Sequence, residues 1–281
     1  MKKANFKPIF IVGNWKTGST LLQFLLAKDN KICNIFPDKI NTDDYDGSSF
    51  WKLYNCHVLI RNTGTCITKE IMKVLNKDLM IEHLNELCDR EYGLLKRPQF
   101  VTCIPFIKWL LPDVQLLGIK RDIYGVVYSY IRSNTAWRRN NHGMKIGLKP
   151  PGWFDMVRKS VIEYAVWTNY YAESILDQFN IPCISYEKIC DNTDDAIKDL
   201  SKILNIDLDI NYETITNLNS AVKEGTKLVS RNRETLHGRL DIGKSDKIEV
   251  PPMTKEQKDE VKEMCKKYKN LKVTDDVIFN G

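Results

Sequence analysis

Long apolar runs are missing from this sequence. No stretch reaches the roughly 18 apolar residues that a transmembrane helix needs, and the first ten residues, MKKANFKPIF, do not resemble a signal peptide. Internal repeats, low-complexity segments and long blocks of like charge are missing as well, which argues against a repeat or disordered protein. We therefore expect one globular domain over residues 1–281, located in the cytoplasm and without a membrane partner.

The sequence also lacks the spacing of a metal site or a disulfide framework. No two of its eight cysteines form C-x-x-C, none stands at zinc-like spacing with a histidine, and the four histidines are dispersed. Scattered cysteines fit reduced thiols in the cytosol. We expect no bound metal. The cysteines are Cys33, Cys56, Cys66, Cys88, Cys103, Cys183, Cys190 and Cys265.

A strong excess of one charge is absent too. The formal net charge is +6 and the isoelectric point is about 8.7, so the chain is mildly basic. Anionic small molecules suit this balance, but it falls short of the concentrated basic stripe that a nucleic-acid binder shows. We expect a small-molecule partner and no nucleic acid.

What is present is an alternation of short apolar runs with helical patterns. Residues 8–13, 114–121 and 181–186 read as buried strands, and 57–60 could be another. Alternating strands and helices predict a mostly parallel sheet covered on both faces, a three-layer α/β/α fold. The expected helices cover 19–28, 67–92, 123–131 with Asp122 as N-cap, 153–180, 194–205 and 254–269.

The three strands end at noteworthy residues. They lead to Gly13, to Lys120–Arg121 and to Tyr186. In open parallel sheets, ligands bind at the carboxyl ends of the strands. The sequence therefore predicts that these residues converge at one site.

The loop after the first strand is almost a phosphate-binding P-loop. Gly13 and Gly18 have the P-loop separation, but Ser19 occupies the place of the P-loop lysine, and Lys16 lies on the loop instead. The free N–H groups and positive dipole end of the following helix favour an anion here. The identity of the anion is left open by this loop alone.

Three ordered segments resemble the sulfotransferases that use 3′-phosphoadenosine 5′-phosphosulfate (PAPS). GNWKTGSTLL resembles their 5′-phosphosulfate loop. LLGIKRDIYGVVYSYIR resembles their 3′-phosphate motif, through Arg121 and Ser129, and IPCISYEKI resembles the segment whose tyrosine, here Tyr186, lies near the adenine. The resemblance spans residues 8–205. It implies a P-loop-like sulfotransferase fold, PAPS as donor, 3′,5′-adenosine bisphosphate (PAP) as product, and no required metal.

The resemblance also implies a role for each matching residue. Lys16 would stabilise the charge that develops on the leaving phosphate oxygen. A loop at about 225–250 would close over the donor. The sequence of this segment matches the family's loop less closely than the three motifs do. The implied donor-binding residues are Trp15, Lys16, Thr17, Gly18, Ser19, Thr20, Arg121, Ser129 and Tyr186, with Arg239, Gly243 and Lys244 from the later loop.

The acceptor side departs from the family pattern. Lys96 matches the lysine of the K-T-H motif of cytosolic members, but Pro98 or Gln99 replaces its histidine. The general base stays open among Asp38, Asp43, Asp44, His57, His83 and His142. A polar, basic segment at 134–152 reads as a lid or acceptor loop. The acceptor-pocket candidates are Trp51, Phe106, Trp137 and Trp153.

Two other functions fit parts of the pattern. A nucleotide or small-molecule kinase would need the P-loop lysine at position 19, which is a serine here. A catalytically inactive nucleotide-binding homologue would keep the donor site and lose turnover. We favour sulfuryl transfer to a hydroxyl or amine of a soluble small molecule, and leave open whether the chain forms a homodimer.

Overall fold

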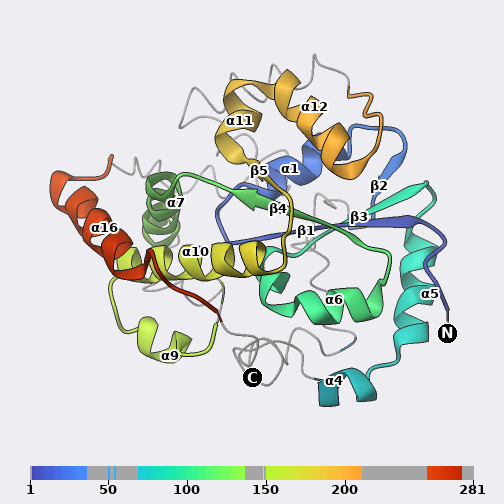
Figure 1. Cartoon of the computed structure of the whole chain (residues 1–281), viewed down its shortest axis with the longest axis horizontal. Coiled ribbons are helices and arrows are strands. Elements are labelled where there is room, and N and C mark those ends of the chain that lie inside the picture. The colour runs from blue at the N-terminus through green and yellow to red at the C-terminus, as the bar shows by residue number, and fades with distance from the viewer. Residues whose placement is uncertain are drawn as a thin grey trace.

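The computed structural model describes residues 2–36, 50, 54, 69–136, 148, 150–210 and 252–273. Within this part of the chain, one sheet of five parallel strands has the order β2-β3-β1-β4-β5. Helices cover both of its faces, as Figure 1 shows. The predicted three-layer α/β/α fold is confirmed. The strands are β1 (Lys7–Gly13), β2 (Ile32–Asn34), β3 (Tyr92–Lys96), β4 (Gln115–Lys120) and β5 (Cys183–Ser185).

Strand β1 lies at the centre of the sheet and contributes to both cores. Phe10 and Val12 pack into one cluster of buried residues, and Ile9 and Ile11 pack into the other. Side chains of a strand alternate between the two faces of a sheet, so a strand buried on both faces reads as one continuous apolar run. This explains why residues 8–13 could be recognised as a strand.

One face of the sheet carries α1 (Ser19–Leu26), α11 (Tyr186–Asp191) and α12 (Thr193–Leu204). Leu22 and Leu26 of α1 pack there with Leu200 and Leu204 of α12. The opposite face carries the larger core. Its elements are α5 (Lys77–Leu87), η1 (Pro98–Cys103), α6 (Ile104–Leu110), α7 (Ile123–Ala136), α10 (Val161–Gln178) and α16 (Lys255–Tyr268), while α4 (Lys69–Val74) and α9 (Trp153–Met156) lie at its margin.

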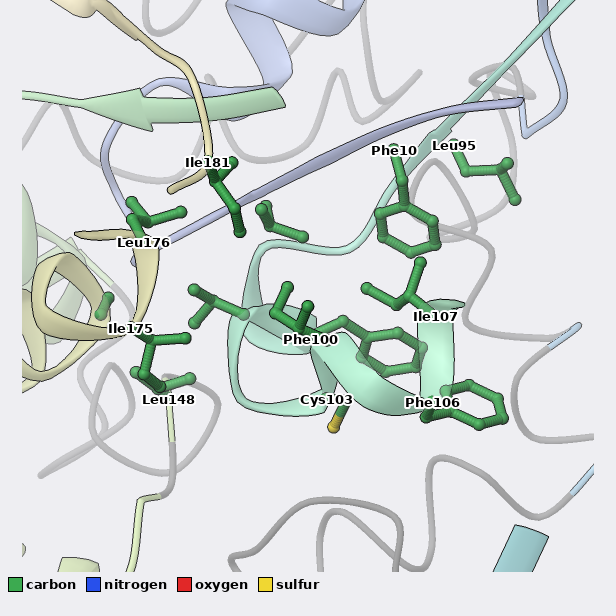
Figure 2. Packing of buried hydrophobic residues seen from close by; sticks show 14 of the residues in the cluster. Phe10, Leu95, Phe100, Cys103, Phe106, Ile107, Leu148, Ile175, Leu176 and Ile181 are labelled. Atoms are coloured by element: carbon green, nitrogen blue, oxygen red, sulfur yellow. The ribbon is translucent and has the colours of Figure 1, made fainter. Parts of the chain in front are cut away.

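Phe106, a predicted acceptor-pocket residue, belongs to this larger core. Its side chain is completely buried and packs against Phe100, with ring centroids 6.0 Å apart, and against Trp109 at 5.8 Å. Figure 2 shows it beside Phe100 and Ile107 in the packed interior. The apolar face of α6 carries it inward, which periodicity alone could have indicated.

Two predicted helices are each divided in the structure. The 67–92 helix is α4 followed by α5, because Asn76 caps α5 by accepting a hydrogen bond from the Leu79 N–H. Its predicted end at 92 is wrong, since α5 ends at Leu87 and Tyr92 begins β3. The 153–180 helix is α9 followed by α10, because Ser160 caps α10 through the Glu163 N–H. Strands β2 and β3 were not expected, and the candidate strand 57–60 lies outside the described residues. No helix in the described part of the chain has the length and hydropathy to cross a membrane.

Candidate active site

The carboxyl ends of the strands bring together the residues that the sequence analysis singled out. Strands β1, β3, β4 and β5 end at Gly13, Lys96, Lys120 and Ser185, and all run in the same direction. After β1, the next two strands in the sequence, β2 and β3, lie on one side of β1 in the sheet, and β4 and β5 lie on the other side. The end of β1 is therefore a topological switch point, where open α/β sheets bind ligands.

The loop after β1 is held by its own hydrogen bonds. The Thr17 hydroxyl donates to the Asn14 carbonyl at 2.8 Å, and the Trp15 N–H donates to the Asn14 side-chain oxygen at 2.8 Å. Asn14 and Thr17 are each only 1% exposed. These two hydrogen bonds within the loop stabilise its shape.

Lys16 occupies an unusual backbone conformation in this loop. Its φ of 73° lies in the left-handed region, which costs a residue with a side chain about 1–2 kcal/mol. Its ammonium lies 3.9 Å from the centre of the Trp15 ring, and that ring meets Tyr130 edge-on at 5.0 Å. The fold thus holds a lysine at the centre of the loop in a strained conformation that local preference alone would not select.

Gly18 is the N-cap of α1 and joins the helix to the loop. Its φ is +98°, and no side chain of the described residues caps the helix there. A Cβ at this position would lie 2.2 Å from Cδ2 of Tyr186, so the ring of Tyr186 fits only against glycine. The first amides of α1, with Ser19 and Thr20, form the kind of helix start that binds anions.

Arg121 connects the loop to α7. Its Nη1 donates to the Lys16 carbonyl and to the Ser129 hydroxyl, both at 3.2 Å. The guanidinium carbon lies 4.2 Å from the centre of the Tyr186 ring, a cation–π contact. The predicted pair Arg121 and Ser129 is thus brought together, and Tyr186 joins it. The predicted N-cap of α7 is also confirmed, since Asp122 accepts from the Gly125 N–H at 2.8 Å.

Lys96 brings another cation to the helix start. It is 2% exposed, and its Nζ donates to the Thr20 hydroxyl at 3.0 Å. Strand β3 places it there, because Lys96 pairs in register with Ile11 of β1. Lys96 thus contacts the first turn of α1, and Arg121 contacts the loop that carries Lys16 just before it. Three cationic residues near one helix start suit a ligand with several negative charges.

Tyr186 stays neutral in this cationic setting. Burial raises the pKa of its hydroxyl to about 12, although the charge of Arg121 opposes the shift. Its ring therefore offers an uncharged flat surface beside Gly18 and Arg121 at ordinary pH.

Sequence reasoning missed two residues that shape the site. Glu187 accepts from the Asp122 N–H and from the Ser185 hydroxyl, both at 2.9 Å, and so ties the end of β5 to the start of α7. It stands beside Tyr186 in the quoted motif, which could have indicated it. Asn169 contacts Asn14 from the middle of α10, and no local pattern marks it.

Two other predicted site residues lie in the described part of the chain, on α5 and α9. His83 lies on α5, with its Nδ1 3.3 Å from the Tyr54 hydroxyl. Trp153 lies on α9 against Phe154, with ring centroids 4.3 Å apart. Within the described residues no cluster of three or more metal-ligating side chains occurs. Outside those residues lie Asp38, Asp43, Asp44, Trp51, His57, Trp137, His142, Arg239, Gly243 and Lys244, most of the 134–152 lid and the whole 225–250 loop.

Comparison with known proteins gives the chain a family context. The model of the Sulfotransferase family matches residues 8–209. The sulfotransferase domain from the curacin biosynthetic pathway is similar in structure, with a TM-score of 0.50, 12% identity and coverage of 96% of this chain and 100% of that one. Mouse sulfotransferase SULT7A1 complexed with PAP has a TM-score of 0.48 and 13% identity, covering 98% and 87% of the two chains. No curated protein sequence matches.

Proposed function

The chain belongs to the sulfotransferase family, and from this premise we propose that it transfers a sulfuryl group from PAPS to a hydroxyl or amine of a small soluble acceptor. One observation carries the proposal. The lysine-bearing loop, the Arg121–Ser129 pair and the Tyr186 ring come from three distant segments and are in direct contact. The three motifs of the PAPS resemblance thus form one site.

The residues of this site fit the chemistry of the donor. The start of α1 and the loop amides suit the 5′-phosphosulfate end. Arg121 uses Nη1 for its two contacts, and its remaining N–H groups can bind the 3′-phosphate, with the Ser129 hydroxyl beside them. The neutral Tyr186 ring suits the adenine.

Lys16 and Lys96 supply positive charge for the reaction. The donor's S–O bond to phosphate breaks while the acceptor oxygen or nitrogen forms its new bond to sulfur, and the acceptor proton leaves to a base. Negative charge develops on the departing phosphate oxygen, where a lysine ammonium stabilises it. Lys16 takes this role in the proposal, and Lys96, fixed through Thr20, adds charge at the helix start. The general base stays open among the candidates already named.

The acceptor, the cellular location and the domain organisation of the protein are also proposals. The mild net charge of +6 suits an anionic small molecule and falls short of the concentrated basic stripe of a nucleic-acid binder. A single domain acting in the cytoplasm is the simplest arrangement, and a homodimer stays open.

Calorimetric binding tests the donor site directly. PAP and ATP are titrated, each with and without magnesium, into the wild type, Lys16→Ala and Arg121→Ala. We expect PAP to bind without metal, and Arg121→Ala to weaken it about 10- to 150-fold, as expected for loss of a charge-assisted hydrogen bond. Lys7→Ala is the control, because this cation at the opposite end of β1 pairs with Glu91 at 2.9 Å.

Two results would decide against this function. Magnesium-dependent ATP binding with indifference to PAP would favour a kinase. PAP binding without donor turnover, tested over a range of hydroxyl and amine acceptors, would favour a nucleotide-binding homologue that has lost catalysis.

A further inference from the structure

A buried chain of polar side chains connects the lysine-bearing loop to α10. Asn14 Nδ2 donates to Asn169 Oδ1 at 3.4 Å, and Asn169 Nδ2 donates to Glu173 Oε1 at 2.9 Å. Asn14 and Asn169 are 1% and 3% exposed, although they lie 155 residues apart in the sequence. The chain thus joins the first strand–helix connection to a long helix of the opposite layer.

The direction of every hydrogen bond in this chain follows from one backbone group. The Trp15 N–H can only donate, so the side-chain oxygen of Asn14 must face it. The Asn14 amide nitrogen then faces Asn169 and needs an acceptor there. Asn169 must present its oxygen to Asn14 and its nitrogen to Glu173, whose carboxyl accepts. Each orientation determines the next, so the network has a single arrangement.

The loop is held at two points. Asn169 holds the start of the loop through Asn14, and Arg121 holds its middle through the carbonyl of Lys16. The left-handed φ of Lys16, 73°, lies along the backbone between the Asn14 side chain and this carbonyl. A strained residue of this kind keeps its conformation only when the surrounding structure fixes it.

We infer that Asn169 is a positioning residue: through Asn14 it fixes the conformation of the 14–18 loop and thereby the place from which Lys16 acts. Glu173 orients the Asn169 amide and so acts one step further away. The anchoring of the loop stands on the contacts alone, whereas its consequence for sulfuryl transfer rests on the proposed function.

Hydrogen exchange of the loop tests the anchor without any ligand. Mass spectrometry follows a peptide covering residues 13–20 in the wild type, Asn169→Leu and the double variant Asn169→Asp with Glu173→Gln. Loss of the link should speed loop exchange about three- to tenfold, the effect of one net hydrogen bond on local opening. The double variant should restore protection, because the carboxylate introduced at position 169 accepts from both Asn14 and the new glutamine amide.

Two controls separate positioning from general destabilisation. Ser174→Ala removes a neighbouring α10 contact, the 3.0 Å bond from the Val273 N–H, and should leave the loop peptide unchanged. Exchange of a peptide from α12, on the opposite face of the sheet, should not respond to Asn169→Leu. Wild-type loop exchange in Asn169→Leu, or failure of the double variant to restore protection, would overturn the inference.

Donor measurements on the same variants keep the two proposals apart. If PAP binds, Asn169→Leu should lower kcat for donor turnover more than it raises the KM for PAPS, and the double variant should recover kcat. A purely structural role would lower the unfolding midpoint without this pattern and without local loop opening. If the wild type does not bind PAP, the proposed function fails, and the exchange result still decides whether Asn169 anchors the loop.

Discussion

Gly18 and Tyr186 depend on each other at the start of α1. An added Cβ would lie 2.2 Å from the tyrosine ring, and the backbone φ of +98° already disfavours any residue with a side chain. We predict that Gly18→Ala lowers the free energy of unfolding by about 1–3 kcal/mol and weakens PAP binding, because the ring or the loop must move. Urea unfolding and calorimetry measure the two effects.

Gly152 offers a matched control for that substitution. Its φ is +84°, but no atom of the described residues lies within 4 Å of where its Cβ would be. Gly152→Ala should therefore show the backbone cost alone and bind PAP as the wild type does. Equal PAP affinity in Gly18→Ala and wild type would show that the contact between Tyr186 and the 14–18 loop does not shape PAP binding.

The site residues that could be identified from the sequence are those that belong to contiguous motifs. Lys16 and Gly18 stand in one short loop, and Arg121 precedes Ser129 by two helical turns, so spacing alone could place them together. Asn169 could not be found in this way. It is one polar residue on a long helix, and its meaning comes only from Asn14, which approaches it through the tertiary fold.

Helix α16 is attached to α10 by a cluster around Glu163. The Lys267 ammonium lies 2.7 Å and the Tyr268 hydroxyl 2.8 Å from the same Glu163 oxygen. Burial alone would raise the pKa of Glu163, but these two hydrogen bonds outweigh it and the net pKa is lowered. A carboxyl whose pKa falls on folding stabilises the protein above its unfolded pKa and loses that contribution as the pH falls through its folded pKa.

We predict that Glu163→Gln lowers the unfolding temperature at pH 7 and makes its decline in acid less steep. Thermal unfolding between pH 7 and pH 3 measures both. Asp259→Asn is the control, because Asp259 pairs locally with Lys262, three residues later on α16. Identical acid profiles for wild type and Glu163→Gln would show that the attachment of α16 does not depend on this ion pair.

The elements that sequence reasoning missed are short or interrupted. Strand β2 has three residues, ICN, and does not lie in a continuous apolar run of the sequence. Strand β3 reads YGLLK and contains Gly93, which pattern reasoning takes as a break. The structure explains that glycine, because a Cβ there would lie 2.3 Å from the ring of Phe6. Strands β1 and β4 could be predicted because they are longer and apolar, as expected for the inner strands of a parallel sheet.

On the scale of the whole molecule, the sheet lies between two hydrophobic cores and contributes side chains to both. Phe106 lies in one core and Leu200 in the other, and each is completely buried. Strand β1 sends alternate side chains into both clusters, so neither core can loosen without disturbing the strand that leads into the 14–18 loop. This coupling supports the proposal that residues 1–281 form one domain.

We predict that the chain unfolds in one transition and that a cavity in either core lowers the free energy of unfolding of the whole chain. Phe106→Ala and Leu200→Ala should each destabilise by about 2–5 kcal/mol. PAP at 100 times its dissociation constant should add about 2.7 kcal/mol to every form, since neither residue belongs to the donor loop. Far-ultraviolet circular dichroism and tryptophan fluorescence, followed together in urea, measure this. Two separate transitions, with PAP shifting only one, would mean that the two cores fold independently and that β1 does not couple them. Coincident curves that both shift with PAP would mean that the donor site reports on the stability of the whole sheet.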